Sequence, residues 1–414
     1  MRRRLHRILR RMVLLTVRHL LLLRRVPRPG ERPRVRVLLQ HAHGMGGTIR
    51  TVLNLSGHLA GDHDIEIVSV VRSKPDPFFP IPPNVHVRFA DDRTVPPTLF
   101  ARLLSRLPSV ITPIGDPTFK RMNLYTDLRL LLILCGRSPN VLVGTRPSLN
   151  LLAAELAPRG TVSIGQDHMN LDAYHSNVRR EITRSYRRLD ALSVLTEHSR
   201  AAYTSLLQGS RVRVELIPNA VPKLAGGPSP RDAKVILAAG RLTTQKGFDL
   251  LIQAYEPLAA EFPDWTLRIF GSGPQRAHLK TLVAEMGLKA QIALRGRTPH
   301  LADEMTRASI HVLSSRFEGL PMVIIEAMSK GLPVVAFDCP TGPAEMITDG
   351  VDGVLVPAED VQALTAALRK LMADAALRHR IGDQARRSSR AYDPDLIATR
   401  WTTLTRELIA RSPC

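Results

Sequence analysis

Two glutamates occur within one stretch, residues 315–338, which reads SRFEGLPMVIIEAMSKGLPVVAFD. Glu318 ends a loop after an apolar run, and Glu326 lies eight residues further on in a helical pattern. Because eight residues make slightly more than two helical turns, both carboxylates are expected to face one cleft. Carboxylates accept hydrogen bonds from sugar and ribose hydroxyls, and the backbone N–H groups of Leu320 and Met322 suit an anionic ligand. In the alternative interpretation, Glu318 is a solvated loop charge and Glu326 is a helix-dipole partner.

Two cations follow the apolar run KVILAAG at residues 234–240, within the sequence GRLTTQKGFDLLIQAY. Arg241 and Lys246 therefore occupy the loop and first helical turn directly above a predicted strand. Two positive charges at such a position can hold a diphosphate. Because most basic residues lie on protein surfaces, the alternative is that both are ordinary solvated side chains.

A glycine-rich turn follows the first predicted strand, in the sequence HAHGMGGTIRTVLNL. Gly44, Gly46 and Gly47 stand between strand and helix, where bare backbone can approach a phosphate at a helix N-terminus. The spacing differs from the G-x-G-x-x-G of dinucleotide enzymes. Such a turn can also be simple tight geometry.

The elements that must position these residues are short apolar runs separated by longer helical patterns. This alternation is typical of parallel βαβ units and predicts a doubly wound α/β fold. Candidate strands in the first half are residues 35–40, 64–71, 85–89, 141–145, 161–166 and 191–196. Those in the second half are residues 234–240, 266–271, 291–296, 310–315, 333–338 and 353–357. Ligands bind beyond the carboxyl ends of such strands, so two facing sheets predict a cleft that contains the motifs.

Length and composition favour two domains. A chain of 414 residues with 44% hydrophobic content can bury sizeable cores, which excludes a fully disordered protein. The segment PKLAGGPSPRD at residues 222–232 is too rich in Gly, Pro and Ser for a helix or central strand, and it predicts an interdomain linker. Beyond residue 360 the pattern is wholly helical.

The net charge is +21, from 58 Lys and Arg against 37 Asp and Glu, and it predicts attraction to a polyanion. Nucleic acid, an anionic membrane surface and an acidic polymer are the candidates. Only 4% of residues are aromatic and no zinc-finger or basic-zipper pattern occurs, which disfavours nucleic acid.

The cysteines are far apart and lack C-x-x-C spacing, as expected of incidental thiols in a reducing cytoplasm; they are Cys135, Cys339 and Cys414.

The first 25 residues predict a basic amphipathic helix, followed by the Pro-rich break PRPGERPR at residues 27–34. Arg18 and His19 interrupt the apolar run, so it is too short to span a bilayer. Such a helix can lie in an anionic interface, and the alternative is a leader helix that packs on the protein or stays disordered. The predicted apolar stripe comprises Leu5, Ile8, Leu9, Met12, Thr16, Leu20 and Leu23, with arginines mostly off it.

Several motifs occur together in a fixed order: GMGGTIR, IPNAV, GRLTTQKGFDLLIQA, FGSGPQ, the stretch around Glu318, and DGVDGVLVP. In this order they resemble a retaining family 4 glycosyltransferase of the GT-B fold, of the type that builds bacterial cell-surface polysaccharides. The resemblance covers nearly all of residues 34–390 and is tighter in the second half. It implies two facing Rossmann-like domains with a cleft between them.

The resemblance assigns a role to each motif residue. It implies that backbone at Gly46 and Gly47 binds diphosphate and that Arg241 and Lys246 neutralise it as it leaves. It further implies that Glu318 contacts donor-sugar hydroxyls. Glu326 would hold the ribose, beside Leu320 and Met322. The family stabilises the leaving group electrostatically without a metal, so no cofactor and no Asp-x-Asp site are expected, and Asp91-Asp92 matches one poorly.

The family also has a histidine after a first-domain strand that approaches the donor sugar. The sequence TVSIGQDHMNLDAYHS offers His168 at the matching place, with Gln166 and Asp167 as weaker alternatives. A lone histidine is more often structural, and the two interpretations of His168 have similar weight.

The resulting domain prediction has four parts. Residues 1–33 form the basic amphipathic segment, and residues 34–222 form an acceptor-side Rossmann-like domain. Residues 223–390 form the nucleotide-sugar-binding domain, and residues 391–414 form a helix that packs back on the first domain.

The predicted enzyme is cytoplasmic and peripheral at the inner face of the cell membrane, with its basic helix on anionic lipid. It moves a hexosyl or N-acetylhexosaminyl group from a UDP-sugar to a lipid-linked or polymeric cell-envelope acceptor.

Three rival functions were weighed. A nicotinamide-dependent dehydrogenase lacks support because the glycine fingerprint is incomplete. A sugar-nucleotide epimerase of the same fold is the main enzymatic alternative, since donor-binding residues alone do not establish the use of an acceptor. A basic nucleic-acid-binding protein is the remote alternative.

Overall fold

The computed structural model describes residues 2–23 and 32–411. Residues 27–31 of the Pro-rich break and Cys414 lie outside this described part. The chain divides into two compact units, and each is considered by itself. Unit 1 contains residues 1–220 and 394–414, and unit 2 contains residues 221–393.

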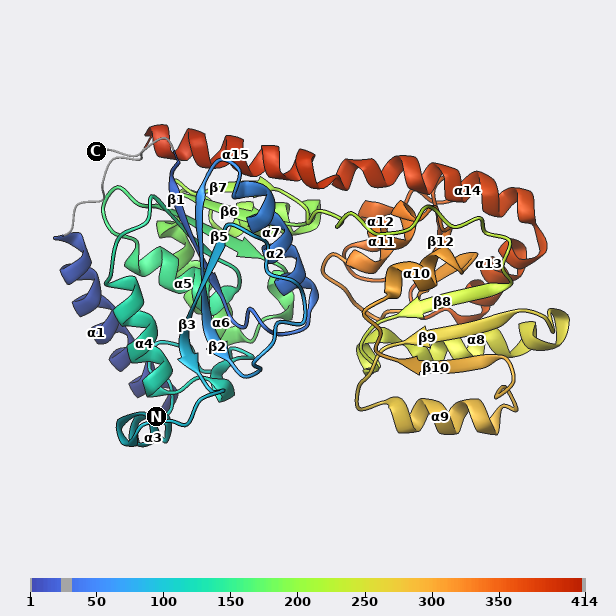
Figure 1. Ribbon diagram of the computed structural model, residues 1–414, viewed down its shortest axis with the longest axis horizontal. Helices are drawn as coiled ribbons and strands as arrows, with labels where there is room; N and C mark the ends of the chain where they lie inside the picture. The colour runs from blue at the N-terminus through green and yellow to red at the C-terminus, as the bar shows by residue number, and fades with distance from the viewer. Residues whose placement is uncertain (1, 24–31, 412–414) are drawn as a thin grey trace. The chain divides into compact units, whose positions relative to one another are not determined.

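Unit 1 is built on a seven-stranded parallel sheet with the order β3-β2-β1-β4-β5-β6-β7 (Figure 1). The order reverses beside β1, which makes the sheet doubly wound, as predicted. The six strands expected from the sequence are all present. The strands are β1 (Arg34–Leu39), β2 (Asp64–Arg72), β3 (Val85–Asp92), β4 (Val141–Gly144), β5 (Val162–Asp167), β6 (Ala191–Val194) and β7 (Arg213–Leu216).

Strand β7 was missed by the sequence analysis. It is an edge strand whose four residues are only half-buried, so it lacks a continuous apolar run. Arg213 and Glu215 interact with each other on this strand, and Arg213 also pairs with Glu407. Polar residues are compatible with an edge strand because one side stays near water.

Helices cover both faces of the unit 1 sheet, and two separate cores result. Alternate residues of one strand point to opposite faces, so Leu38 joins one core whereas Val37 and Leu39 join the other. In Figure 1, α15 runs along the upper side of this unit and α1 lies beside α4. The helices of unit 1 are α1 (Arg2–Leu22), α2 (Gly47–Leu59), α3 (Leu99–Ser105), α4 (Leu124–Leu134), α5 (Pro147–Leu156), α6 (Ser176–Ser185), α7 (Glu197–Leu206) and α15 (Pro394–Arg411).

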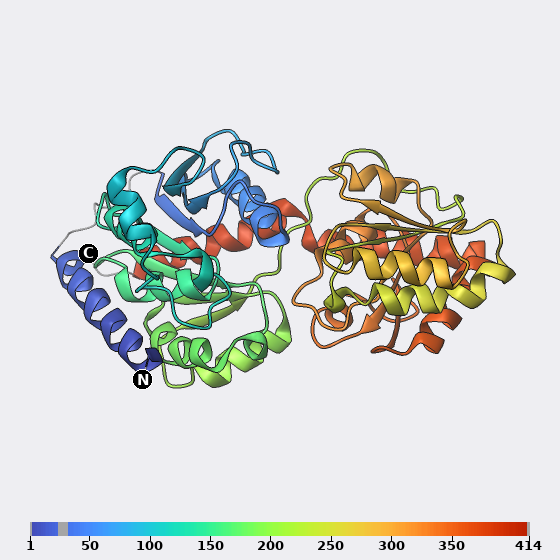
Figure 2. The same cartoon turned by 90° about the horizontal axis from the view of Figure 1, so that it is seen from below.

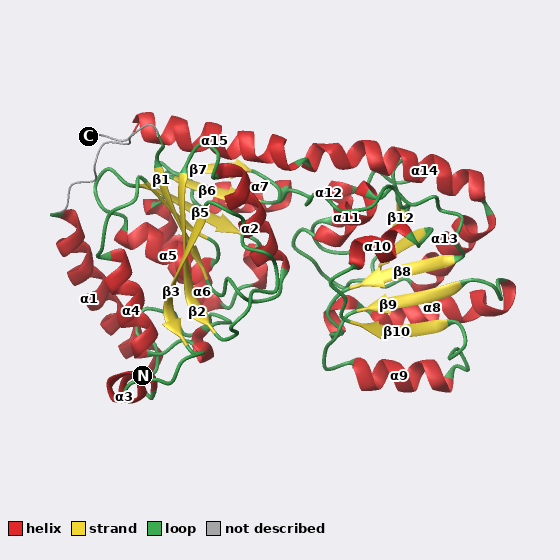
Figure 3. Ribbon diagram, viewed as in Figure 1, coloured by secondary structure: helices red, strands yellow, loops and turns green. Residues whose placement is uncertain are grey.

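Unit 2 contains a six-stranded parallel sheet with the order β10-β9-β8-β11-β12-β13, again doubly wound (Figure 3). All six strands predicted for the second half are present. Their apolar runs are nearly continuous because helices bury both faces of a parallel sheet. The strands are β8 (Val235–Ala239), β9 (Thr266–Phe270), β10 (Ile292–Gly296), β11 (Ile310–Leu313), β12 (Val334–Asp338) and β13 (Val354–Pro357).

The helices of unit 2 lie on both faces of its sheet. Figure 2 shows α8 and α9, which pack on one another, on one face. The segment predicted as linker is held on this unit, because Lys330 Nζ donates to the carbonyls of Ala225, Gly226 and Gly227. The helices are α8 (Phe248–Glu261), α9 (Arg276–Glu285), α10 (Leu301–Thr306), α11 (Met322–Ser329), α12 (Pro343–Met346), α13 (Val361–Ala373) and α14 (Ala375–Ser388).

The predicted N-terminal helix is present as α1, and it packs on unit 1. Leu14 and Leu21 are buried in the unit 1 core. The predicted apolar stripe, including Leu5 and Met12, is exposed to solvent, and the opposite face of the helix carries the buried side chains. This packing agrees with the alternative in which the helix packs on the protein, and contact of the stripe with an anionic interface stays a prediction. Within residues 2–23 and 32–411, no helix has the length and apolar content needed to cross a bilayer.

Candidate functional site

The centre of the site in unit 2 is the pair formed by Lys246 and Glu318. Lys246 lies in a short 3-10 turn (Thr244–Lys246) after β8, and Glu318 lies in the loop after β11, the neighbouring strand. Lys246 Nζ donates to Glu318 Oε1, and Ser315 Oγ donates to the same oxygen at 2.6 Å. The Glu318 side chain is only 8% exposed. The cation and the carboxylate thus meet beyond the carboxyl ends of two adjacent strands.

Close backbone packing fixes the turn that carries Lys246. Gly247 has φ 57°, and a Cβ there would lie 2.0 Å from the Ser314 carbonyl oxygen. Only glycine fits, because both the left-handed conformation and the close approach exclude a side chain. Arg316 then joins the two loops, since its guanidinium donates to the Thr244 carbonyl at 2.7 Å and to both oxygens of Asp249.

The FGSGPQ motif packs against the loop that carries Arg241. A Cβ at Gly271 would lie 1.8 Å from the Gly240 carbonyl oxygen, and one at Gly273 would lie 2.2 Å from that of Leu242. The glycines therefore let two loop backbones touch. Arg241 is exposed, and its side chain has no hydrogen-bond or ion-pair partner within the described part of the chain. Its charge is therefore available to a ligand.

The position of Glu326 requires a correction. The helix α11 begins at Met322, so residues 318–321 are not helical and the spacing of eight residues does not correspond to two helical turns. Pro321 explains this start, because the residue before a proline avoids helical geometry. Glu326 lies one turn into α11 and is buried. Neither Leu320 N–H nor Met322 N–H has an acceptor among the described residues, as is usual at a helix start, where anions bind.

A buried histidine in unit 2 was missed by the sequence analysis. His311 lies on β11 and is fully buried, and neither ring nitrogen has a partner among the described residues. Burial and, to a smaller extent, the positive charge of Lys246 together lower its pKa to about 3. The ring is therefore neutral at pH 7. Its one signal in the sequence is a polar residue inside an apolar strand.

The glycine turn of unit 1 ends where α2 begins, at Gly47. A Cβ at Gly46 or Gly47 would have no atom within 4 Å, so both backbones border open space. The Gly46 carbonyl accepts from Arg50 N–H at 3.1 Å, which starts the helix. This geometry allows an anion to approach the amino end of α2.

His168 follows β5 directly, after a buried and strongly held carboxylate. Asp167 accepts hydrogen bonds from the hydroxyls of Tyr174 and Tyr203. Burial raises the Asp167 pKa to about 6, although these hydrogen bonds oppose the shift. Burial, together with the positive charge of Arg146, lowers the His168 pKa to about 4. The His168 ring nitrogens have no partner within the described residues.

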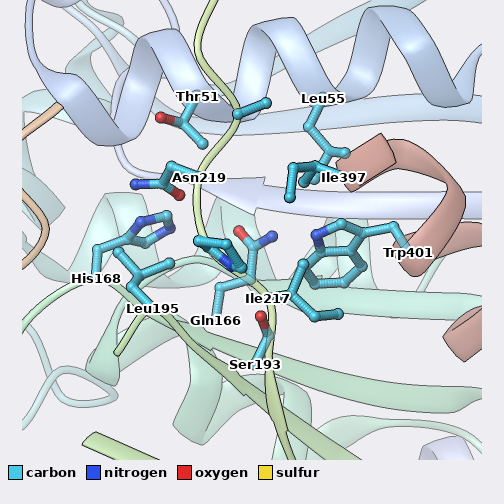
Figure 4. A pocket seen from close by; sticks show the side chains of 12 residues that line it. Thr51, Leu55, Gln166, His168, Ser193, Leu195, Ile217, Asn219, Ile397 and Trp401 are labelled. Carbon is cyan, nitrogen blue, oxygen red and sulfur yellow. The ribbon is translucent and has the colours of Figure 1, made fainter. Parts of the chain in front are cut away.

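A pocket of unit 1 lies beside His168, at the carboxyl ends of β5, β6 and β7. Figure 4 shows Thr51, His168 and Asn219 on one side and Ile397 and Trp401 across from them. Gln166 also lines it, and its buried Oε1 has no partner among the described residues. His168 and Gln166 were predicted from the sequence, whereas Asn219 was not, although Asn219 lies within the IPNAV motif.

The structure joins some of the predicted site residues directly and leaves others separate. Lys246 and Glu318 are in contact, and Arg241, Leu320, Met322 and Glu326 belong to the same unit. Gly46, Gly47 and His168 belong to unit 1.

Asp91 and Asp92 are held by other side chains. Asp91 pairs with Arg93 and accepts from Thr126, and Asp92 pairs with Arg72. No group of three or more His, Cys, Asp or Glu side chains in the described ranges is arranged to hold a metal ion.

Comparison with known families places a specific domain in unit 2. Residues 224–388 match the family model described as glycosyl transferases group 1. An exopolysaccharide phosphotransferase of Streptomyces coelicolor is 36% identical over 390 residues, which cover 91% of this chain and 41% of the relative. The amylovoran biosynthesis glycosyltransferase AmsD of Erwinia amylovora is 27% identical over 378 residues, which cover 89% of this chain and 98% of the relative. The chain thus spans less than half of the first relative and nearly all of the second.

The solved structure of TarM from S. aureus, in complex with fondaparinux, alpha-GlcNAc-glycerol and UDP, has a similar fold. The TM-score is 0.71 at 15% sequence identity, and the match covers 90% of this chain and 99% of that one. At this identity the likeness concerns the fold alone. It confirms the predicted architecture of two Rossmann-like domains.

Proposed function

We propose that this chain, which carries a group 1 glycosyltransferase domain and has the GT-B fold, is a retaining family 4 glycosyltransferase. It moves a hexosyl or N-acetylhexosaminyl group from a UDP-sugar to a lipid-linked or polymeric cell-envelope acceptor. The observation that carries this proposal is the Lys246–Glu318 pair at the carboxyl ends of β8 and β11, close in sequence to the start of α11.

Cations and helix N–H groups would stabilise the departing diphosphate. In the proposed reaction, the bond between the sugar C1 and the diphosphate oxygen breaks, and negative charge grows on the diphosphate. Arg241 and Lys246 neutralise this charge, and the N–H groups of Leu320 and Met322 donate hydrogen bonds to the diphosphate oxygens without reorienting. The proposed enzyme therefore requires no metal, because protein cations neutralise the charge of the diphosphate.

The two carboxylates bind the donor and do not act as nucleophile and acid. Glu318 accepts hydrogen bonds from sugar hydroxyls, and Glu326 accepts them from the ribose. Glu318 Oε1 already accepts from Lys246 and Ser315, which orients the carboxylate and reduces its nucleophilicity. The acceptor hydroxyl bonds to C1 on the face that the diphosphate leaves, and its proton passes to a departing phosphate oxygen.

The proposal also assigns roles to residues of unit 1. The backbone at Gly46 and Gly47, which borders open space, binds the diphosphate. His168, a neutral ring at pH 7, contacts the donor sugar. A neutral imidazole can donate one hydrogen bond and accept another. The pocket beside it, lined by Gln166 and Asn219, offers further polar contacts.

The names of the relatives support the acceptor class. One relative is a biosynthesis glycosyltransferase for amylovoran, and the TarM complex contains UDP. The name exopolysaccharide phosphotransferase belongs to a protein of which this chain spans 41%, so phosphotransfer is not proposed here. We place the enzyme in the cytoplasm, peripheral at the inner face of the cell membrane, where the positively charged chain meets anionic lipid.

The deciding experiment is a screen of purified protein against UDP-, GDP- and ADP-sugars with EDTA present, in which thermal shift and nucleotide release are measured together. We expect selective stabilisation by one UDP-sugar and slow release of UDP. Release that requires added divalent metal would contradict the metal-free mechanism. An absence of response to every nucleotide sugar would contradict the proposed donor class.

A sugar-nucleotide epimerase is the alternative that the screen also tests. An epimerase converts the nucleotide sugar into its epimer without an acceptor, whereas a transferase releases free nucleotide. Product analysis after incubation without acceptor therefore separates the two functions.

A further inference from the structure

The helix α1 is an integral part of unit 1, attached by a polar and apolar inner face. Arg10 is buried, and it pairs with Glu181 at 2.7 Å and donates to the Ile111 carbonyl at 2.8 Å. A His6 ring nitrogen lies 2.9 Å from the Ser109 carbonyl oxygen. Leu14 and Leu21 complete this face within the core. The opposite face of α1 therefore points away from the protein.

The outward face of α1 is apolar and bordered by arginines. Its large side chains recur at spacings of three and four residues, which places them on one side of the helix. Leu5 is 66% exposed and Met12 is 55% exposed, values that a contact face would not keep. The exposed apolar residues are Leu5, Ile8, Leu9, Met12, Leu15 and Leu20, and the arginines of this helix include Arg4, Arg7, Arg11 and Arg18.

A second exposed apolar segment lies at residues 95–107. The helix α3 packs on α4 and buries Ala101, while Leu99 remains 83% exposed. The segment ends two residues before Ser109, whose carbonyl oxygen lies 2.9 Å from a His6 ring nitrogen, so its end adjoins the amino end of α1. Most of the exposed large apolar side chains of the described chain belong to these two segments. Those of the second segment are Val95, Leu99, Phe100, Leu103 and Leu107, with Arg102 and Arg106 among them.

We propose that the outward face of α1 and the segment 95–107 together form one docking surface for an anionic lipid bilayer. Apolar side chains enter the boundary between headgroups and acyl chains, and the neighbouring arginines bind anionic headgroups. Charge favours lipid over a second copy of this chain, since the arginines of two copies would repel each other. Only the role of this docking rests on the proposed function: it would bring unit 1 to a lipid-linked acceptor.

The test uses point substitutions, because deletion of α1 would also remove Arg10, Leu14 and Leu21 from the core. Full-length protein is sedimented with vesicles of phosphatidylcholine alone or with phosphatidylglycerol added. The pairs are Leu9→Gln/Met12→Gln on α1 and Leu99→Gln/Leu103→Gln on α3. The control pair is Val351→Gln/Leu396→Gln, which removes exposed apolar side chains elsewhere.

We expect the wild type to bind the anionic vesicles and not the neutral ones. Each test pair should weaken binding by at least about tenfold, while the control pair binds like the wild type. Unchanged binding by both test pairs, or equal binding to neutral vesicles, would overturn the proposal. A concentration-dependent dimer that the test pairs abolish, without vesicle binding, would assign the surface to a second copy instead.

Enzymatic activity separates this inference from the proposed function. Release of UDP from a UDP-sugar in solution needs no membrane, so it should be the same for both test pairs and the wild type. Vesicle binding without any nucleotide release would leave the docking surface standing and would count against the transferase. Normal nucleotide release without vesicle binding would support the transferase and overturn the docking surface.

Discussion

The Lys246 ammonium donates a hydrogen bond to the Glu318 carboxylate, although 72 residues separate them in the chain. Both side chains are largely shielded, with 15% of Lys246 and 8% of Glu318 exposed. Each charge compensates the other, so removal of one partner leaves the other poorly solvated. Stability and catalysis are consequently coupled at this pair, and they must be separated by experiment.

Lys246→Ala should lower turnover by about 100-fold or more, as the loss of one preorganised electrostatic group does elsewhere. It should also lower stability, because Glu318 remains buried without its cation. The double variant Lys246→Ala/Glu318→Gln should recover much of the stability and none of the turnover. Urea unfolding and steady-state nucleotide release measure the two effects. Recovery of turnover in the double variant would show that Lys246 serves only to balance Glu318.

Glu326→Gln should weaken donor binding. A hydrogen bond to a charged group contributes about 1.5–3 kcal/mol, which corresponds to about 10- to 100-fold in affinity. Calorimetric titration with UDP measures the change directly. The melting temperature without ligand serves as the control, since the isosteric amide preserves packing. Unchanged affinity for UDP would assign Glu326 a structural role in α11.

Gly47→Ala should weaken donor binding without a loss of stability. The added methyl group has no protein atom within 4 Å, and alanine is favoured over glycine in a helix. A ligand phosphate at the amino end of α2 would, however, meet this methyl group, and overpacking of about 1–3 kcal/mol would lower the affinity by about fivefold or more. Gly227→Ala in unit 2, where the added methyl also meets open space and the backbone is not in the left-handed region, controls for the substitution itself. Normal donor affinity in Gly47→Ala would place the diphosphate elsewhere.

The pH dependence of stability should reveal His168. Its pKa is lowered from 6.5 to about 4, so the unfolded chain binds more protons between these values. The stabilisation is therefore complete above pH 6.5 and is lost as the pH falls towards 4. Between pH 7.5 and pH 5, His168→Gln should lose about 2 kcal/mol less stability than the wild type. Urea unfolding at the two pH values measures this difference. If the variant and the wild type lost the same unfolding free energy between pH 7.5 and pH 5, the ring would not be held neutral.

Asp167 should act in the opposite direction. Its pKa is raised from 3.8 to about 6, so the folded protein binds more protons between these values. Acidification through this range stabilises the fold and partly offsets His168. Asp167→Asn should therefore lose about 1 kcal/mol more than the wild type between pH 7.5 and pH 5. A smaller loss than that of the wild type would contradict the assigned direction of the Asp167 pKa.

The amino-acid sequence by itself predicted most of the elements of this protein and the residues to which we assign its chemistry. Continuous apolar runs between helical patterns located twelve strands correctly, because strands buried on both faces leave that pattern. The half-buried edge strand β7 leaves none and was missed. Arg241, Lys246 and Glu318 were found because each follows a strand, where a parallel sheet presents its loops.

Only the tertiary structure decided which groups meet and which faces are covered. The Lys246–Glu318 contact depends on β8 and β11 becoming neighbours in the sheet, which local pattern does not encode. The apolar stripe of α1 was located from the sequence, but which face of the helix packs on unit 1 depends on partners distant in the chain, such as Glu181 for the buried Arg10. Glu326 was predicted to lie two helical turns from Glu318. This prediction was wrong because the helix begins only after Pro321. Local sequence sets which conformations a segment can adopt, whereas partners distant in the chain select the contacts.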